Sequence, residues 1–222
     1  MGGPSLVAHS IDIRCSPEYY APTLYSAIQF TCIPKRGYRD MSTTQTSIKR
    51  HSLEEARTII DKLGRYCFDD FHPLFKEGKV PLFEEIDGKT LGSFLVLGPN
   101  TGWWRKLGLM IFFDNPLARW TGKRFTTPFD DKKRGEGINL FQNRILPERF
   151  PVYTYVNKSL FDQNLCLTVA YPRFPSSLFG LIDQLRKIDE GVFLGQGHHK
   201  FLWGKEYSLQ GYFVLCALNQ EG

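Results

Sequence analysis

The chain has 222 residues, of which 42% are hydrophobic, 23% are charged and 14% are aromatic. A chain of this length and apolar content can bury a core without disulfide bonds, which excludes wholesale disorder and a collagen-like polymer. No stretch approaches the roughly 18 consecutive apolar residues of a transmembrane helix, and the net charge of +5 permits a nucleic acid or an anionic membrane as partner without requiring one.

The first 47 residues are expected to form a poorly ordered extension. Their apolar residues follow neither the helical nor the strand period. The segment is interrupted by Pro4, Pro17, Pro22 and Pro34. It lacks the apolar core of a secretory signal, and a polar run starts at Ser42. We therefore place a single folded domain at residues 48–222.

A helix is predicted to begin after Ser52. Residues 52–55 read SLEE, a capping box in which the serine hydroxyl and a carboxylate three residues later accept hydrogen bonds from free backbone N–H groups. Gly64 suits the end of the helix. Apolar residues recur between these points at helical spacing: Leu53, Ala56, Ile60 and Leu63. We expect a helix over residues 53–63 that packs its apolar face on the domain.

Six short segments are predicted to be β-strands, because each is apolar or alternating and is bounded by turn residues. They are residues 90–97, 109–113, 152–156, 165–171, 191–197 and 211–218. Their connections are too short for crossover helices, which predicts an antiparallel sheet. This number of strands favours a curved sheet or a closed barrel, since closure removes the unpaired edges.

A second helix is predicted near the C-terminus, over residues 178–188. Apolar residues recur there at helical spacing, and Gly191 follows the last turn. Arg186 lies three residues from both Asp183 and Asp189, so on a helix it would bridge two carboxylates. This arrangement is either a surface ladder of ion pairs or a guanidinium at the mouth of a cavity. The expected fold class is α+β and mostly β, with an N-terminal and a C-terminal helix.

Trp120 precedes a glycine and two adjacent cations. An indole beside Gly122 suits the closure of one end of a barrel, where the glycine lets another backbone approach. Lys123 and Arg124 would point to opposite faces of a strand. One of the two therefore enters the interior, where it needs a carboxylate, a carbonyl or an anionic ligand as its partner.

The segment 120–125, WTGKRF, resembles the tryptophan–glycine–lysine–phenylalanine block of the GXWXG-type family. Three later segments resemble, in order and spacing, the C-terminal domain of unknown function of that family: residues 182–189, 194–195 and 212–215. The name-giving motif falls at residues 88–92, which read GKTLG, with threonine in place of tryptophan. The resemblance spans about residues 50–218. It implies a compact calycin-like barrel, and the family has no settled activity.

The sequence carries no recognisable cofactor, metal or nucleic-acid motif. Its five cysteines are scattered and never paired as CxxC, which argues against a disulfide framework or a zinc finger and favours a reducing, cytoplasmic location. The adjacent pair His198 and His199 is interpreted as a solvated turn, with an acid–base role for one of them as the alternative. We expect no metal, no cofactor and no nucleic acid; the oligomeric state stays open.

Three classes of function fit these features. The first is a lipocalin-like protein that binds an apolar or weakly anionic small molecule in the barrel, where a small-residue face at Cys166, Thr168 and Ala170 leaves room. The second is a cofactor-free isomerase, cyclase or lyase acting on a secondary metabolite in the same cavity. The third is a protein-interaction module that uses the aromatic loop 101–107. Binding is favoured, and the enzyme is the alternative.

The side chains expected to face the ligand are aromatic or charged. They are Trp120, Lys123, Arg124, Tyr153, Tyr155, Asp183 and Arg186. In the enzyme, the acid–base groups would come from the two tyrosines, from Asp183 or Arg186, or from His199. The sequence alone does not select a catalytic residue among them.

Overall fold

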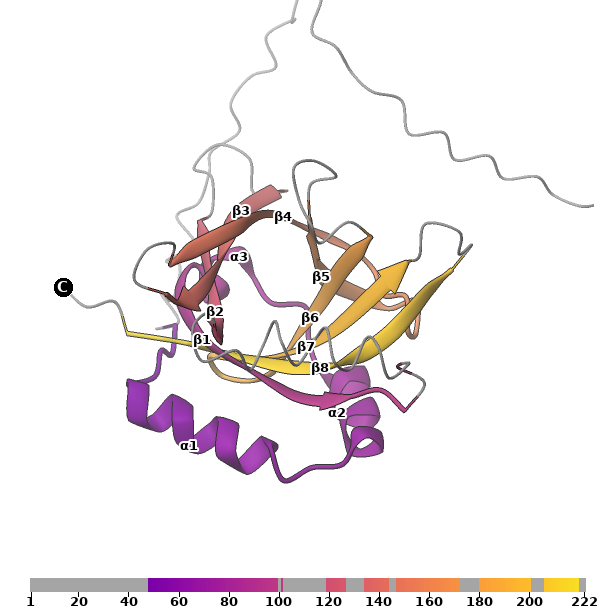
Figure 1. Ribbon diagram of the computed structural model, residues 1–222, viewed down its shortest axis with the longest axis horizontal. Helices are drawn as coiled ribbons and strands as arrows, with labels where there is room; N and C mark the ends of the chain where they lie inside the picture. The colour runs from indigo at the N-terminus through magenta and orange to yellow at the C-terminus, as the bar shows by residue number, and fades with distance from the viewer. Residues whose placement is uncertain are drawn as a thin grey trace, which may run out of the picture. The chain divides into compact units, whose positions relative to one another are not determined.

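Eight antiparallel strands form a closed barrel, in which each strand pairs with its neighbours in the sequence and β8 pairs with β1 (Figure 1). The strands are β1 (Gly88–Leu97), β2 (Arg119–Thr126), β3 (Arg134–Gln142), β4 (Glu148–Lys158), β5 (Leu165–Ala170), β6 (Leu181–Asp189), β7 (Val192–Lys200) and β8 (Tyr207–Ala217). The structure is a computed structural model that describes residues 48–99, 101, 119–126, 134–143, 147–171, 180–200 and 206–219. The closed antiparallel barrel agrees with the expected mostly-β fold.

Three α-helices and a short 3-10 helix precede the barrel: α1 (Leu53–Leu63), η1 (Phe68–Asp70), α2 (Phe71–Glu77) and α3 (Phe83–Ile86). Helix α1 begins at the expected capping box, in which the N–H of Glu55 donates to the hydroxyl of Ser52 and the N–H of Ser52 donates to the carboxylate of Glu55. In the described ranges, no helix is long and apolar enough to cross a membrane.

The prediction of a helix over residues 178–188 is wrong, because residues 181–189 form strand β6. Along β6, Asp183 faces the barrel interior, whereas Gln184 and Arg186 face outwards and contact the β4–β5 connection and α2. Both faces of this strand are buried, so its apolar residues do not follow the strand period of two and instead imitate a helical stripe.

The described side chains form two apolar clusters, one inside the barrel and one outside it. On β8, Phe213 and Leu215 belong to the inner cluster, whereas Tyr212 and Val214 belong to the outer one. Helix α3 adds two side chains to the inner cluster, and α1 and α2 pack their apolar faces on the outer one. Strand alternation therefore separates the barrel interior from the surface that the helices cover.

The predicted small-residue face of β5 does not line the interior. Leu167 and Val169 belong to the inner cluster, so Cys166 and Thr168 lie on the outer face of the strand. The pairing of Leu167 with Leu185 of β6 fixes this orientation. Large side chains thus fill the interior along β5, and the expectation of room there is wrong.

The antiparallel strands β1 and β2 approach each other closely at two glycines. A β-carbon at Gly92 would lie 2.7 Å from the Trp120 ring, and one at Gly122 would overlap the carbonyl oxygen of Thr90. Gly122 also has a φ of +141°, which a residue with a side chain rarely adopts. Beside this close approach, the hydroxyl of Thr90 accepts from the N–H of Lys123 and donates to its carbonyl. The expected close approach of another backbone at Gly122 is confirmed.

Several expectations concern segments outside the described residues. These are the extension over residues 1–47, the strand over 109–113 and the aromatic loop over 101–107 beyond Thr101. All the described elements belong to one compact unit, residues 45–222.

Candidate functional site

Lys123 lies inside the barrel, where only 1% of the residue is exposed. Its Nζ atom donates to the side-chain oxygens of Asn139 and Tyr171, each 2.7 Å away, and lies 3.0 Å from Oδ2 of Asp183. These partners occupy the three donor positions of the ammonium group. An inward-facing cation at this point was expected to have a carboxylate, a carbonyl or an anionic ligand as its partner, and the structure supplies the carboxylate of Asp183.

The partners of Lys123 also bond to one another. The hydroxyl of Tyr171 donates to Oδ2 of Asp183 over 2.9 Å. The indole N–H of Trp120 donates to Oδ1 of Asn139 over 3.1 Å, and the amide group of Asn139 donates to the carbonyl of Phe150. Side chains from β2, β3, β6 and the residue after β5 thus form one hydrogen-bonded cluster, which we call the inner polar cluster: Trp120, Lys123, Asn139, Tyr171 and Asp183.

Aromatic rings surround the ammonium group of Lys123. Its Nζ atom lies 5.1, 5.6 and 5.9 Å from the ring centroids of Tyr171, Trp120 and Phe213. A cation at such distances is attracted by the ring faces. The surroundings of the inner polar cluster are therefore apolar and aromatic, so its charges depend mainly on the neighbouring side chains for compensation.

Burial changes the proton affinities of the cluster. Desolvation lowers the pKa of Lys123, and the carboxylate of Asp183 partly offsets that effect. Burial, reinforced by the charge of Asp183, raises the pKa of Tyr171 well above 10. The phenol therefore stays protonated at neutral pH and acts as a donor to the carboxylate.

One oxygen of the cluster is left open. Among the described residues, no hydrogen-bond partner reaches Oδ1 of Asp183, although its side chain is only 7% exposed. Gly197 lies directly opposite on β7, and a β-carbon there would meet nothing closer than this oxygen, at 3.7 Å. At Gly195, two residues away, the ring of Phe213 fills the equivalent space. Beside the carboxylate of Asp183, the described residues therefore leave room for at least one further carbon atom at Gly197.

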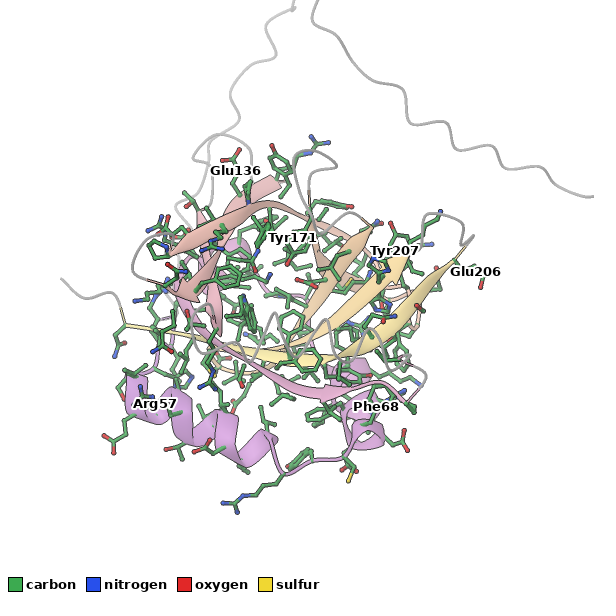
Figure 2. The ribbon with its side chains drawn as sticks, viewed as in Figure 1. Arg57, Phe68, Glu136, Tyr171, Glu206 and Tyr207 are labelled. Carbon is green, nitrogen blue, oxygen red and sulfur yellow. The ribbon has the colours of Figure 1, made fainter. Side chains whose placement is uncertain are left out.

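The inner polar cluster lies away from the end of the barrel where α3 adds Phe83 and Ile86. Tyr171, the residue after β5, is only partly buried, and Figure 2 shows it within the ring of strands, between β4 and β5. By contrast, Leu185 and Phe193 are fully buried deeper in the barrel. The described hydrogen-bond partners of Lys123 therefore come from β3, β6 and the residue after β5, and none of them comes from α3.

Three of the seven expected site residues come together in this cluster: Trp120, Lys123 and Asp183. Arg124 lies on the outer face and pairs with Glu148 over 2.7 Å. Tyr153 is 51% exposed, and Tyr155 shares the outer face of Thr168, with which it pairs. These outward-facing residues do not belong to the interior site.

Arg186 also lies outside the barrel, which corrects its expected place at a cavity mouth. Its guanidinium group makes two hydrogen bonds, of 2.6 and 2.7 Å, to the carboxylate of Asp162 and donates to the carbonyls of Phe75 and Leu165. This contact lowers the pKa of Asp162. Arg186 therefore joins β6, α2 and the β4–β5 connection, and we assign it a structural role.

Two members of the inner polar cluster were missed by the sequence analysis. Asn139 is a single amide in the apolar run Ile138–Phe141, a pattern that signals a buried polar partner. Tyr171 follows Leu167 and Val169 at the strand period of two, and both of those residues face inwards. The same alternation would have predicted that Tyr171 also faces the interior. His199, the expected acid–base alternative, lies beside Gly180 at the end of β7.

A second polar chain is buried on the outer face, under α2. His198 Nε2 lies 3.2 Å from the side-chain oxygen of Gln196, whose amide donates to the hydroxyl of Tyr212. That hydroxyl lies 3.3 Å from Nδ1 of His72. Burial lowers the pKa of His198 to about 4, so this imidazole is neutral in the folded protein at neutral pH. The expected solvated turn at His198 is wrong, because this side chain is 3% exposed.

In the described part of the chain, no group of three His, Cys, Asp or Glu side chains is arranged to hold a metal ion. The chemistry that the inner polar cluster offers is hydrogen bonding and proton transfer: an ammonium, a phenol and a carboxylate lie within 3.0 Å of one another.

Replacing Lys123 by Met should lower the free energy of unfolding by about 3–5 kcal/mol, because it leaves the buried carboxylate of Asp183 without its cation. Arg124→Met, one residue away on the outer face, should cost less than about 1 kcal/mol, since its ion pair is exposed. Urea unfolding of both variants measures the difference. Equal losses would show that the two cations are energetically alike.

Because His198 is neutral in the folded protein, the free energy of unfolding is predicted to depend on pH. Its pKa is about 4 when folded and about 6.5 when unfolded, so the unfolded chain takes up the extra proton in that window. Stability therefore falls as the pH drops from 6.5 towards 4. Between pH 7 and pH 5 the protein should lose about 2 kcal/mol more than a His198→Gln variant does. Parallel pH profiles in urea unfolding would contradict this assignment.

Comparison with known proteins gives no family. No protein-family model matches the chain, and no curated protein sequence matches it. Among solved structures, the chain is similar to the crystal structure of a protein from Thermomonospora curvata, with 14% sequence identity and a TM-score of 0.43. The match covers 75% of this chain and 97% of that one.

Proposed function

We propose that the barrel binds a small, mainly apolar molecule that carries a hydroxyl or similar donor group. The observation that carries this proposal is Oδ1 of Asp183, which accepts no hydrogen bond from the described residues and lies 3.7 Å from the unfilled side-chain position of Gly197. An ionised carboxylate oxygen is a strong hydrogen-bond acceptor. A ligand hydroxyl placed beside Gly197 supplies the missing donor.

The energetics of the Lys123–Asp183 pair support a ligand role. A buried ion pair adds little net stability compared with well-packed apolar side chains of similar size. The other side chains inside the barrel are apolar, and many of them are large aromatic rings. In this proposal Lys123 and Tyr171 keep Asp183 ionised and oriented, and the aromatic rings contact the apolar body of the ligand.

The proposal refines the expected ligand class. All three donors of Lys123 are already used within the protein, and the open acceptor belongs to a carboxylate. A second carboxylate beside Asp183 would be repelled, so an uncharged donor is preferred to an anion. Membership of the GXWXG-type family stays part of the proposal, as an expectation from sequence resemblance.

Three naphthalene probes of nearly equal size distinguish a ligand with a hydroxyl donor from one without a donor and from an anion. 2-Naphthol should bind at least tenfold more tightly than 2-methoxynaphthalene, since a hydrogen bond to a charged acceptor contributes about 1.5–3 kcal/mol. 2-Naphthoate should bind most weakly. Probe fluorescence titrated with the full chain gives the dissociation constants.

Two variants locate the site. Asp183→Asn should remove the preference for 2-naphthol, whereas Glu148→Gln, the same change on the outer face, should keep it. Gly197→Leu should abolish binding by filling the free space, and it leaves every charged group in place. Equal affinity for 2-naphthol and 2-methoxynaphthalene, or binding that survives Gly197→Leu, would refute the proposed site.

A further inference from the structure

Lys123 has the surroundings of an amine that reacts with carbonyl compounds. Its nitrogen lies 2.7 Å from the phenol oxygen of Tyr171 and 3.0 Å from the carboxylate of Asp183, with aromatic rings around it. The unfilled side-chain position at Gly197 lies 3.7 Å from the other oxygen of the same carboxylate. A molecule bound there places its polar end next to both the amine and a group that can move protons.

We propose that Lys123 forms a Schiff base with an aldehyde or ketone bound in the barrel, with Asp183 as the proton carrier and Tyr171 as the group that orients it. The inference rests on the proposed function, because the carbonyl compound occupies the same space beside Gly197. It adds a covalent activity and a substrate class: uncharged, mainly apolar carbonyl compounds.

The proton balance of the reaction closes within the cluster. Asp183 takes one proton from the ammonium group, and the freed amine nitrogen bonds to the carbonyl carbon as the carbon–oxygen π bond breaks. The oxygen takes up that proton and becomes a hydroxyl. A second proton passes from the nitrogen through Asp183 to this hydroxyl, which leaves as water. The product is an iminium ion that carries the same charge as the ammonium and remains paired with Asp183.

The surroundings favour each part of this reaction. Desolvation lowers the pKa of Lys123, which eases the loss of its proton, as in other lysines that react from apolar sites. The hydroxyl of the intermediate stands where the open oxygen Oδ1 of Asp183 can accept its hydrogen bond. The carboxylate then serves the iminium as it serves the ammonium, so no charge is left unpaired.

Cinnamaldehyde with sodium cyanoborohydride tests the inference, because the hydride converts an iminium into a stable secondary amine. At neutral pH, peptide mapping by mass spectrometry should find Lys123 modified at least tenfold faster than the exposed Lys89 and Lys158. Exposed lysines react slowly because they are almost fully protonated. Tyr171→Phe and Asp183→Asn should slow the reaction at Lys123 and leave Lys89 unchanged.

Gly197→Leu keeps the test decisive if a charge variant fails to fold. It should block modification of Lys123 while it keeps the amine and the chemical identity of all its partners. The inference is overturned if Lys123 stays unmodified while Lys89 and Lys158 react, or if Gly197→Leu reacts at Lys123 as fast as the wild type. Unmodified Lys123 in a protein that still prefers 2-naphthol overturns the Schiff base alone. Rapid modification in a protein that binds the naphthalene probes equally overturns only the donor preference.

Discussion

The ammonium group of Lys123 is held inside the barrel by three oxygen atoms that lie 2.7–3.0 Å away. Each oxygen comes from a different part of the sheet: Asn139 of β3, Tyr171 after β5 and Asp183 of β6. A buried cation is tolerated only when its donors and its charge are both compensated. The closed meander meets this condition, because it brings side chains distant in sequence to one level of the interior.

Glycines decide where this interior is full and where it is open. At Gly92 and Gly122 the two closely approaching backbones and the Trp120 ring occupy the space that side chains would need. At Gly195 the ring of Phe213 does the same, and this ring also faces the ammonium group. Gly197 differs, since no ring or backbone atom of the described residues lies within 4 Å of the position a β-carbon would take there. The unfilled position at Gly197 lies next to Oδ1 of Asp183, and the proposed ligand would bind there.

Sequence reasoning succeeded where the answer depended on neighbours along the chain. The capping box at Ser52 and the opposite orientations of Lys123 and Arg124 follow from local geometry. It failed where burial on both faces of a strand hid the period of two, as in β6. That error also misplaced Arg186, whose carboxylate partner is Asp162 of the β4–β5 connection.

The partners of Lys123 could not be predicted for a different reason. Asn139 is paired with Lys123 on the neighbouring strand β3, and Asp183 reaches Lys123 from β6; which residues meet there depends on strand register and closure. The sequence lacks information on register where both faces of a strand are buried. The need for a compensating partner was predictable from the cost of burying a charge, but neither its chemical kind nor its identity was.

The central claim is that the inner polar cluster serves a ligand rather than the fold. The stability of the triple variant Lys123→Met/Tyr171→Phe/Asp183→Leu, measured by urea unfolding beside 2-naphthol binding, tests this most directly. Apolar replacement of a whole buried ion pair is often neutral or stabilising, by about 1–4 kcal/mol. The account predicts a variant at least as stable as the wild type that no longer prefers 2-naphthol to 2-methoxynaphthalene. A variant that loses as much stability as Lys123→Met alone, or that keeps the preference, would contradict it.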